Sequence, residues 1–114
     1  MTSPKYIQSA PVTVNPTSTS LGIVDVRDAR LVAIYVKNLD AVQTLDVTVR
    51  RRAALGDDFS DSQVFEELTA IPPLTPKTID FDCGVQAEIE VVGIASGGGL
   101  NATLTVKPDY GRRG

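Results

Sequence analysis

Strict alternation of apolar and polar residues is the feature of this sequence that most limits the folds open to it. Segment 101–107 (NATLTVK) alternates apolar Ala, Leu and Val with polar Asn, Thr and Lys. Segments 45–53 (LDVTVRRRA) and 77–83 (KTIDFDC) follow the same period of two. Successive side chains of an extended chain point to opposite faces, so this period is typical of strands that bury one face. The sequence therefore predicts an all-β protein.

Turn-forming stretches divide the chain into short segments. GDDFSDS, IPPLTP, DCG and SGGG are rich in residues that favour turns, because Gly permits positive φ and Pro fixes φ. Seven or eight short strands fit between such turns in the 114 residues. That number favours an antiparallel β-sandwich with jelly-roll or immunoglobulin-like connections, although the Cys, Trp, Cys set of immunoglobulin domains is absent. The remaining strands are expected at 10–15, 21–26, 30–38 and 86–95.

Segment 60–71 (SDSQVFEELTAI) is the one candidate for a short helix. Ser60 or Ser62 suits a helix N-cap, and Glu66 and Glu67 suit a first turn. The apolar residues of the segment also fit a strand followed by a loop. The sequence leaves both possibilities open.

The polar start of the chain predicts an extended N-terminal arm over 1–20, followed by a single β-sandwich domain over 21–114. Three prolines in the arm exclude a central strand, but 10–15 can still pair at an edge. Residues 1–9 are either a disordered terminus or an arm that becomes ordered on a neighbouring subunit, with Tyr6 and Ile7 as contacts. We expect no signal peptide and no membrane span, because no long apolar run is present.

The stretch SGGG (96–99) raises the question of a phosphate-binding loop. Such loops lead from a strand into a helix N-terminus, and the P-loop form also requires a GK[ST] sequence. Here the glycines lead into the alternating segment 101–107, and the loop contains no Lys or Arg. We therefore expect a flexible hairpin connection.

Groups that commonly carry out acid–base or nucleophilic catalysis are scarce. The chain has no His and one Cys, Cys83, which we expect to be a buried small hydrophobe. The pairs Asp80 with Asp82 and Glu88 with Glu90 each share one face of a strand, and we expect both pairs to be solvated. The sequence therefore predicts a protein that is not an enzyme and that has no cofactor.

The acidic balance of the chain also restricts its ligands. The net charge of −3 argues against a nucleic-acid-binding protein. Asp57, Asp58 and Asp61 lie in an oxygen-rich loop, but their spacing does not match an EF-hand. Calcium binding at this loop is left open, and no metal site is predicted.

Two of the expected strands are apolar on both faces. In 30–38 the residues Val32, Ile34 and Val36 face one side, and Leu, Ala and Tyr face the other. Val92 and Ile94 extend the apolar run of 86–95 in the same way. A two-layer sandwich has only one interior, so the second face must be covered by segment 60–71 or by another chain. We expect a homo-oligomer, with a trimer as the working assumption.

Arginine is concentrated at two places. Arg50, Arg51 and Arg52 end an alternating strand, and Arg112 and Arg113 lie in the last residues of the chain. In the strand, Arg51 falls on the apolar face and must reach the rim of the sandwich. A solvated strand end is one interpretation, and a docking patch for an acidic protein surface is the other.

Taken together, the proline-, threonine- and serine-rich start, the alternating segments and the lack of His resemble the small structural proteins of tailed-phage virions, especially capsid decoration (cement) proteins. The resemblance is one of type and rests on no diagnostic motif. It implies synthesis in the host cytoplasm, residence in the virion and binding to the outside of an assembled head. It also implies partnership with the major capsid protein or another virion protein.

Two other functions fit the sequence. A head–tail connector or tail component would use the same kind of contacts elsewhere in the virion. A carbohydrate-binding β-sandwich module would need aromatic platforms, and the absence of Trp counts against it. The aromatic residues available for such platforms are Tyr6, Tyr35, Phe59, Phe65, Phe81 and Tyr110.

Overall fold

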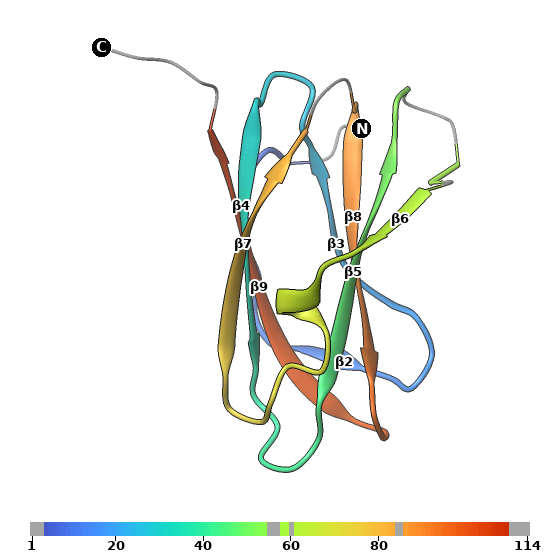
Figure 1. Ribbon diagram of the computed structural model, residues 1–114, viewed down its shortest axis with the longest axis vertical. Coiled ribbons are helices and arrows are strands. Elements are labelled where there is room, and N and C mark those ends of the chain that lie inside the picture. Colours follow the sequence, from blue (N-terminus) through green and yellow to red (C-terminus); the bar gives the residue numbers. More distant parts are fainter. Residues whose placement is uncertain (1–3, 55–57, 60, 84–85, 110–114) are drawn as a thin grey trace.

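A computed structural model of the chain describes residues 4–54, 58–59, 61–83 and 86–109. For residues 61 and 62 it describes the backbone only. The described chain is all-β, and two antiparallel sheets pack face to face (Figure 1). The predicted β-sandwich is therefore confirmed.

The described residues form nine strands and one short 3-10 helix, η1. The strands that the alternation predicted are all present. Two further strands are present: β1, which is too short for a period of two to be recognised, and β6, which corresponds to the strand considered as one possibility for segment 60–71. In chain order the elements are β1 (Ile7–Gln8), β2 (Val12–Val14), β3 (Thr19–Asp25), β4 (Leu31–Asn38), β5 (Leu45–Arg52), β6 (Asp61–Val64), η1 (Glu66–Leu68), β7 (Pro76–Asp82), β8 (Glu88–Ala95) and β9 (Leu100–Asp109).

The strand order identifies the sandwich as a jelly roll. One sheet, the β4 sheet, has the order β1-β9-β4-β7, with β2 also paired to β9. The other, the β8 sheet, has the order β3-β8-β5-β6. The antiparallel pairs β2:β9, β3:β8, β4:β7 and β5:β6 are nested in sequence and alternate between the two sheets, which is the jelly-roll pattern. Immunoglobulin-like connections are thereby excluded.

The glycine stretch SGGG does not form the hairpin that the sequence predicted. β8 and β9 belong to different sheets, so residues 96–99 form an arch that crosses between the layers. Gly99 adopts a φ of +73°, which disfavours other residues at that position. Gln43 holds the arch, because its Oε1 accepts a hydrogen bond from Gly97 N at 2.7 Å and its Nε2 donates to Gly98 O at 2.9 Å. The arch leads into the strand β9 and not into a helix N-terminus, so it lacks the geometry of a phosphate-binding loop.

The N-terminal segment is part of the sandwich. β1 and β2 both pair with β9, with Gln8 opposite Thr105 and Val12 opposite Ala102. The extra residue between these two registers is accommodated as a bulge. Near the start of the segment, Asp25 N donates to Pro4 O at 2.8 Å. Residues 4–14 therefore pair with their own chain, and the expected boundary at residue 20 does not separate an arm from a domain.

Segment 61–71 forms an edge strand followed by η1, so the longer helix considered for 60–71 is absent. β6 pairs with β5, and further on Ile71 N donates to Leu45 O at 2.8 Å. These two attachments hold the segment extended at its ends. Between them, η1 closes the side of the sandwich between β5 and β7 (Figure 1), and its Leu68 is fully buried in the core.

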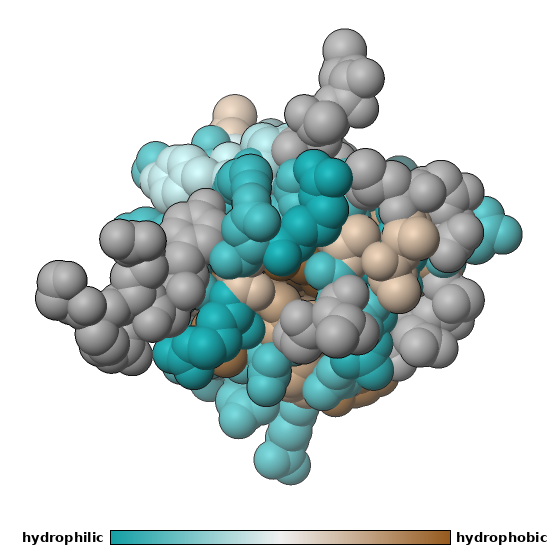
Figure 2. Space-filling model, turned by 90° about the horizontal axis from the view of Figure 1, so that it is seen from above, coloured by the Kyte–Doolittle hydropathy of each residue, from teal (hydrophilic) through white to brown (hydrophobic). Residues whose placement is uncertain are grey.

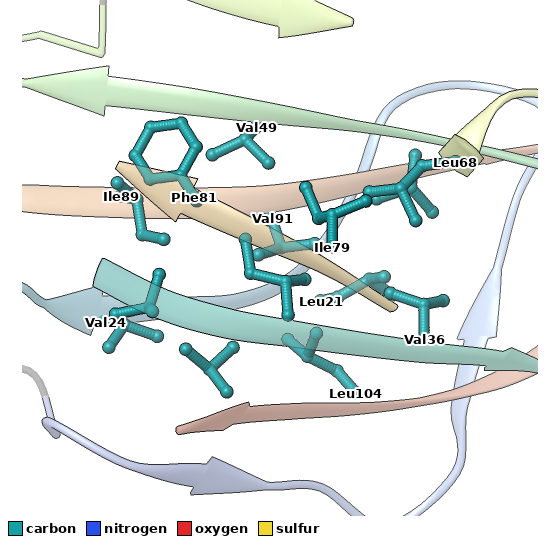
Figure 3. Packing of buried hydrophobic residues seen from close by; sticks show 14 of the residues in the cluster. Leu21, Val24, Val36, Val49, Leu68, Ile79, Phe81, Ile89, Val91 and Leu104 are labelled. Carbon is teal, nitrogen blue, oxygen red and sulfur yellow. The ribbon is translucent and has the colours of Figure 1, made fainter. Parts of the chain in front are cut away.

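Inward-facing side chains of both sheets fill the space between the layers (Figure 3). The predicted inward set Ile79, Phe81 and Cys83 is buried, and Phe81 meets Phe65 edge to face at 6.0 Å between ring centroids. Burial raises the pKa of the Cys83 thiol to about 11, because the thiolate is poorly solvated there. Cys83 is thus a neutral apolar core residue at physiological pH, as expected.

Candidate functional site: the outer faces of the two sheets

β4 buries the face that the sequence analysis assigned to a partner. Val32, Ile34 and Val36 point between the sheets and are fully buried by their own chain. They are therefore wrong as interface candidates. The outward residues of the strand are instead Ala33 and Tyr35, with Leu31 beside them. Alternation could not show which face lies inward, because both faces of β4 are apolar.

Val92 and Ile94 of β8 do lie on the outer face of their sheet. Gly93 between them faces the interior, where an added Cβ would lie 3.3 Å from Val14. Opposite Val92, β5 places Thr48, and β6 in turn places Val64 opposite Thr48. A row of small and apolar side chains therefore crosses the outer face of the β8 sheet.

We call four residues of this face the outer strip. Val64, at the edge strand, is 66% exposed, whereas Val92 in the middle is 4% exposed. All the described strands belong to the two sheets, and η1 lies at their side. No element of the described chain therefore forms a third layer over the outer strip. Its members are Ile23, Val64, Val92 and Ile94.

Two of the three clustered arginines pair with carboxylates of their own sheet. Arg50 Nη1 lies 3.7 Å from Glu90 Oε1, and Arg52 makes a hydrogen-bonded ion pair with Glu88. The Arg52 guanidinium also stacks 4.6 Å from the centroid of the Phe59 ring. Glu88 is buried, so the prediction that it is solvated is wrong. The partner that buries it comes from β5, 36 positions away in sequence.

Arg51 reaches the rim from the inward face of β5, as the alternation required. Its Nη1 donates to Gln63 Oε1 of β6 at 3.1 Å. The arginine cluster is thus tied to its own sandwich through all three members, since Arg50 also donates to Phe59 O at 3.0 Å. The contacts of the arginine cluster therefore link β5 to β6 and β8 within the chain.

Charged residues surround one end of the sandwich. Figure 2 looks onto that end and shows hydrophilic side chains around a hydrophobic centre. Asp25, the last residue of β3, is almost fully buried, and Arg27 Nη2 donates to its Oδ2 at 2.7 Å. The hydrogen bond from Arg27 lowers the pKa of Asp25 to about 2, against the opposing effect of burial.

The outer face of the β4 sheet carries a shallow depression of about 480 Å³. Two neighbouring cross-strand rows line it. In one row Ala33 lies opposite Lys107. The next row crosses β1, β9, β4 and β7 and consists of Gln8, Thr105, Tyr35 and Thr78. The small Ala33 side chain leaves the hollow between its larger neighbours. The complete lining is Tyr6, Gln8, Ala33, Tyr35, Thr78, Thr105 and Lys107.

Both tyrosines are candidates for a sugar platform in the sequence, whereas the depression is visible only in the structure. Tyr6 and Tyr35 lie far apart in the chain, and only the pairing of β1 and β4 on either side of β9 brings them to one face. The Gln and Thr residues of the lining come from β1, β7 and β9, so the sequence around Tyr35 contains no signal for the depression. Of the other aromatic residues considered for a platform, Phe59 has the Arg52 guanidinium over its ring, and Phe65 packs on Phe81.

Several predicted residues lie outside the described part of the chain. These are Asp57, Tyr110, Arg112 and Arg113, together with the side chain of Asp61. Among the residues that are described, no three His, Cys, Asp or Glu side chains gather in a way that suits a metal ion. The same residues include no helix of the length and apolar character needed to cross a membrane.

Comparison with known proteins does not identify a relative. No model of a known protein family matches the chain, and a search of curated protein sequences yields no significant match. The functional argument therefore rests on the two sheet faces.

Proposed function

We propose that the chain is a structural protein of a virus particle, a capsid decoration protein that binds the outside of an assembled tailed-phage head. One observation carries the proposal: the outer strip of the β8 sheet is apolar, no described element forms a layer over it, and its Val64 is 66% exposed. The jelly-roll fold is compatible with this role, because viral capsid domains use it, but the fold alone does not determine function.

Burial of the outer strip against another chain is the proposed mechanism. Ile94 and Val64 provide the apolar contacts, and Arg50 with Glu90 forms a polar border beside them. Apolar burial supplies the free energy of such a contact, and the paired charges add little to affinity because each is already neutralised. Val64 is exposed and Ile94 is half-buried, and apolar side chains grouped on a surface mark interaction sites on many proteins.

The size of the face favours several contacts over a single pairwise one. The strands β3, β8, β5 and β6 contain 7, 8, 8 and 4 residues, so they span a face of about 430 Å², from a strand spacing of about 4.8 Å and a rise of about 3.3 Å per residue. Stable interfaces bury about 800 Å² on each partner. A symmetric oligomer, which we take as a trimer, together with attachment to a head shell supplies the missing area.

Co-sedimentation with purified heads of the encoding phage tests the proposal. The wild-type chain should pellet with the heads, and Ile94→Glu should pellet at least tenfold less, because a carboxylate would be buried in the contact. Val42→Glu is the matched control: it makes the same change at a residue that is 83% exposed in the β4–β5 loop. If wild-type protein stays in the supernatant, or if both variants pellet alike, the decoration role is wrong.

The same contact would also suit a head–tail connector or a tail component. Electron cryo-microscopy of particles separates these positions from the head surface, since density for the jelly roll would appear at the neck or tail. A carbohydrate-binding role is favoured by a different observation, the depression on the β4 sheet.

A further inference from the structure

The depression on the β4 sheet combines aromatic rings with polar groups that have no side-chain hydrogen-bond partner among the described residues. It lies on the opposite layer from the outer strip, so what it binds does not depend on the proposed virion role. Its position on the two inner strands of the sheet, β4 and β9, gives it a rigid floor.

Two tyrosines border the hollow above Ala33. Tyr6 is 48% exposed and Tyr35 is 37% exposed, so each presents much of its ring to solvent. Tyr6 OH donates to Gln8 Oε1 at 3.1 Å, which fixes the relative positions of these two side chains. Aromatic rings held in this way offer apolar faces at little cost in conformational entropy.

Polar groups converge on the same hollow. Gln8 uses only its Oε1, which leaves its Nε2 amide free to donate. Among the described residues, the hydroxyls of Tyr35, Thr78 and Thr105 and the amine of Lys107 also have no side-chain hydrogen bond. Five donors around two rings require a ligand that is apolar on one face and rich in hydroxyl or other acceptor oxygens at its edge.

We propose that this depression binds a pyranose ring of an oligosaccharide. The C–H face of the sugar packs on Tyr35 or Tyr6, and its ring hydroxyls accept hydrogen bonds from Gln8, Thr105 and Lys107. The volume of about 480 Å³ falls in the range of about 300 to 1,000 Å³ that is usual for ligand sites. Because the hollow is shallow and open, the rest of a glycan chain can extend from either side of the bound ring.

A peptide added as an extra strand does not fit this place. Such peptides bind through free backbone groups at a sheet edge. β4 is paired on both sides, with β7 and β9, and β9 is paired with β4 and with β1 and β2. The floor of the hollow therefore offers side chains and no free strand edge.

Nuclear magnetic resonance titration of the full chain tests the proposal. The probes are cellohexaose, mannohexaose, chitohexaose and hexa-galacturonate, each raised to about 10 mM because shallow sites bind at about millimolar strength. At least one probe should shift amide signals of β1, β4 and β9 and leave those of the outer strip unchanged. Absence of shifts with all four probes, or shifts centred on another region, overturns the proposal.

Matched variants show whether the depression itself binds the sugar. Tyr35→Ala removes a ring, and Ala33→Leu fills the hollow without removing any binding group; each should weaken binding at least tenfold. Thr105→Ala should weaken it about threefold, whereas Thr103→Ala, on the same face of β9 but outside the hollow, should not. Circular dichroism checks that each variant is folded. Unchanged binding by both Tyr35→Ala and Ala33→Leu overturns the assignment.

Two further arms define the ligand class. Lys107→Gln should weaken hexa-galacturonate more than the neutral probes if the acidic sugar is preferred, and equally if the amine serves only as a donor; both outcomes support a sugar site. A proline-rich peptide of matched length is the competing probe. If this peptide produces the β4 and β9 shifts and no oligosaccharide does, the site binds peptide and the sugar proposal is wrong.

Discussion

At the scale of single residues, a few polar side chains hold parts of the chain that are distant in sequence. Asn38 is fully buried, and its Nδ2 donates to Gln43 O at 2.8 Å and to Ile71 O at 3.1 Å. Its Oδ1 accepts from Asp40 N at 2.9 Å. One amide thus joins the end of β4, the β4–β5 loop and the segment after η1. Nothing in the local pattern distinguishes Asn38 from an ordinary turn residue.

Replacing Asn38 with Ala should lower the free energy of unfolding by about 2 to 4 kcal/mol, because buried backbone groups lose their partners. Asn101→Ala is the control, since Asn101 is exposed and makes one side-chain bond, with Thr13 at 3.1 Å. Its cost should stay below about 1 kcal/mol. Urea denaturation measures both. Equal losses in the two variants would show that Asn38 does not join these segments.

Asp25 should make stability depend on pH in the acid range. Its pKa is about 2 in the folded protein and 3.8 when unperturbed, so the unfolded chain binds more protons between these values. The stabilising contribution is complete above pH 3.8 and is lost as the pH falls through 2. Because Arg27 is partly exposed, we expect about 1 to 2 kcal/mol.

Thermal melts of the wild type and of Asp25→Asn at several pH values measure this effect. The variant should be less stable than the wild type at neutral pH, and the difference should shrink as the pH approaches 2. Arg27→Gln, which removes the partner instead, should flatten the profile in the same direction. A difference that stays constant from neutral pH down to about 2 would contradict the assignment.

At the scale of elements, alternation predicted the positions of the long strands well. It predicted less well which face of each strand lies inward and which sheet each strand joins. The inward set of β7 and the position of Arg51 on β5 agree with the structure. The inward face of β4 was predicted wrongly. Val32 and Ala33 are both apolar, so the local pattern cannot show which of them points into the core. β1 escaped detection because two residues show no period. The sequence predicts a hairpin at 96–99, and the structure has an arch there, because the local pattern contains no information about which sheet each strand joins.

The docking of β1 depends on the absence of a side chain at Gly22. A Cβ there would lie 2.8 Å from Ile7 Cδ1 and 3.3 Å from Leu104 Cδ2. Gly22→Ala should therefore cost about 1 kcal/mol through overpacking and increase amide exchange at Ser9, whose N donates to Leu104 O at 2.9 Å. Gly98→Ala is the matched control, because an added Cβ there meets nothing within 4 Å. Unchanged Ser9 exchange in Gly22→Ala would argue against this account of β1.

Leu68 gives η1 its structural role. The side chain is fully buried between β5 and β7, at the side where the two sheets are otherwise open. Leu68→Ala should cost about 2 to 5 kcal/mol by leaving a cavity. Leu74→Ala, at a residue that is 60% exposed in a nearby loop, should cost less than about 1 kcal/mol. Urea denaturation midpoints measure both losses of stability. A loss of stability in Leu68→Ala as small as that in Leu74→Ala would mean that η1 does not close the core.

At the scale of the whole molecule, the jelly roll separates two surfaces with different chemistry. The β8 sheet presents the outer strip beside paired charges, and the β4 sheet presents the tyrosine-bordered depression. The sequence predicted a sandwich, and the structure places Val92 and Ile94 on the outer face of the β8 sheet. The sequence could not choose between jelly-roll and immunoglobulin-like order, because the pairing of β3 with β8 and β4 with β7 joins segments remote in sequence.

The central claim is that the outer strip of the β8 sheet is covered by another chain. Light scattering after size-exclusion chromatography tests it most directly. The account predicts a wild-type mass that is a multiple of the 12.1 kDa of one chain, threefold if the oligomer is a trimer. It predicts a single-chain mass for Ile94→Glu and an unchanged oligomer for Val42→Glu. A wild-type mass of 12.1 kDa at every concentration, with the fold intact, would contradict it.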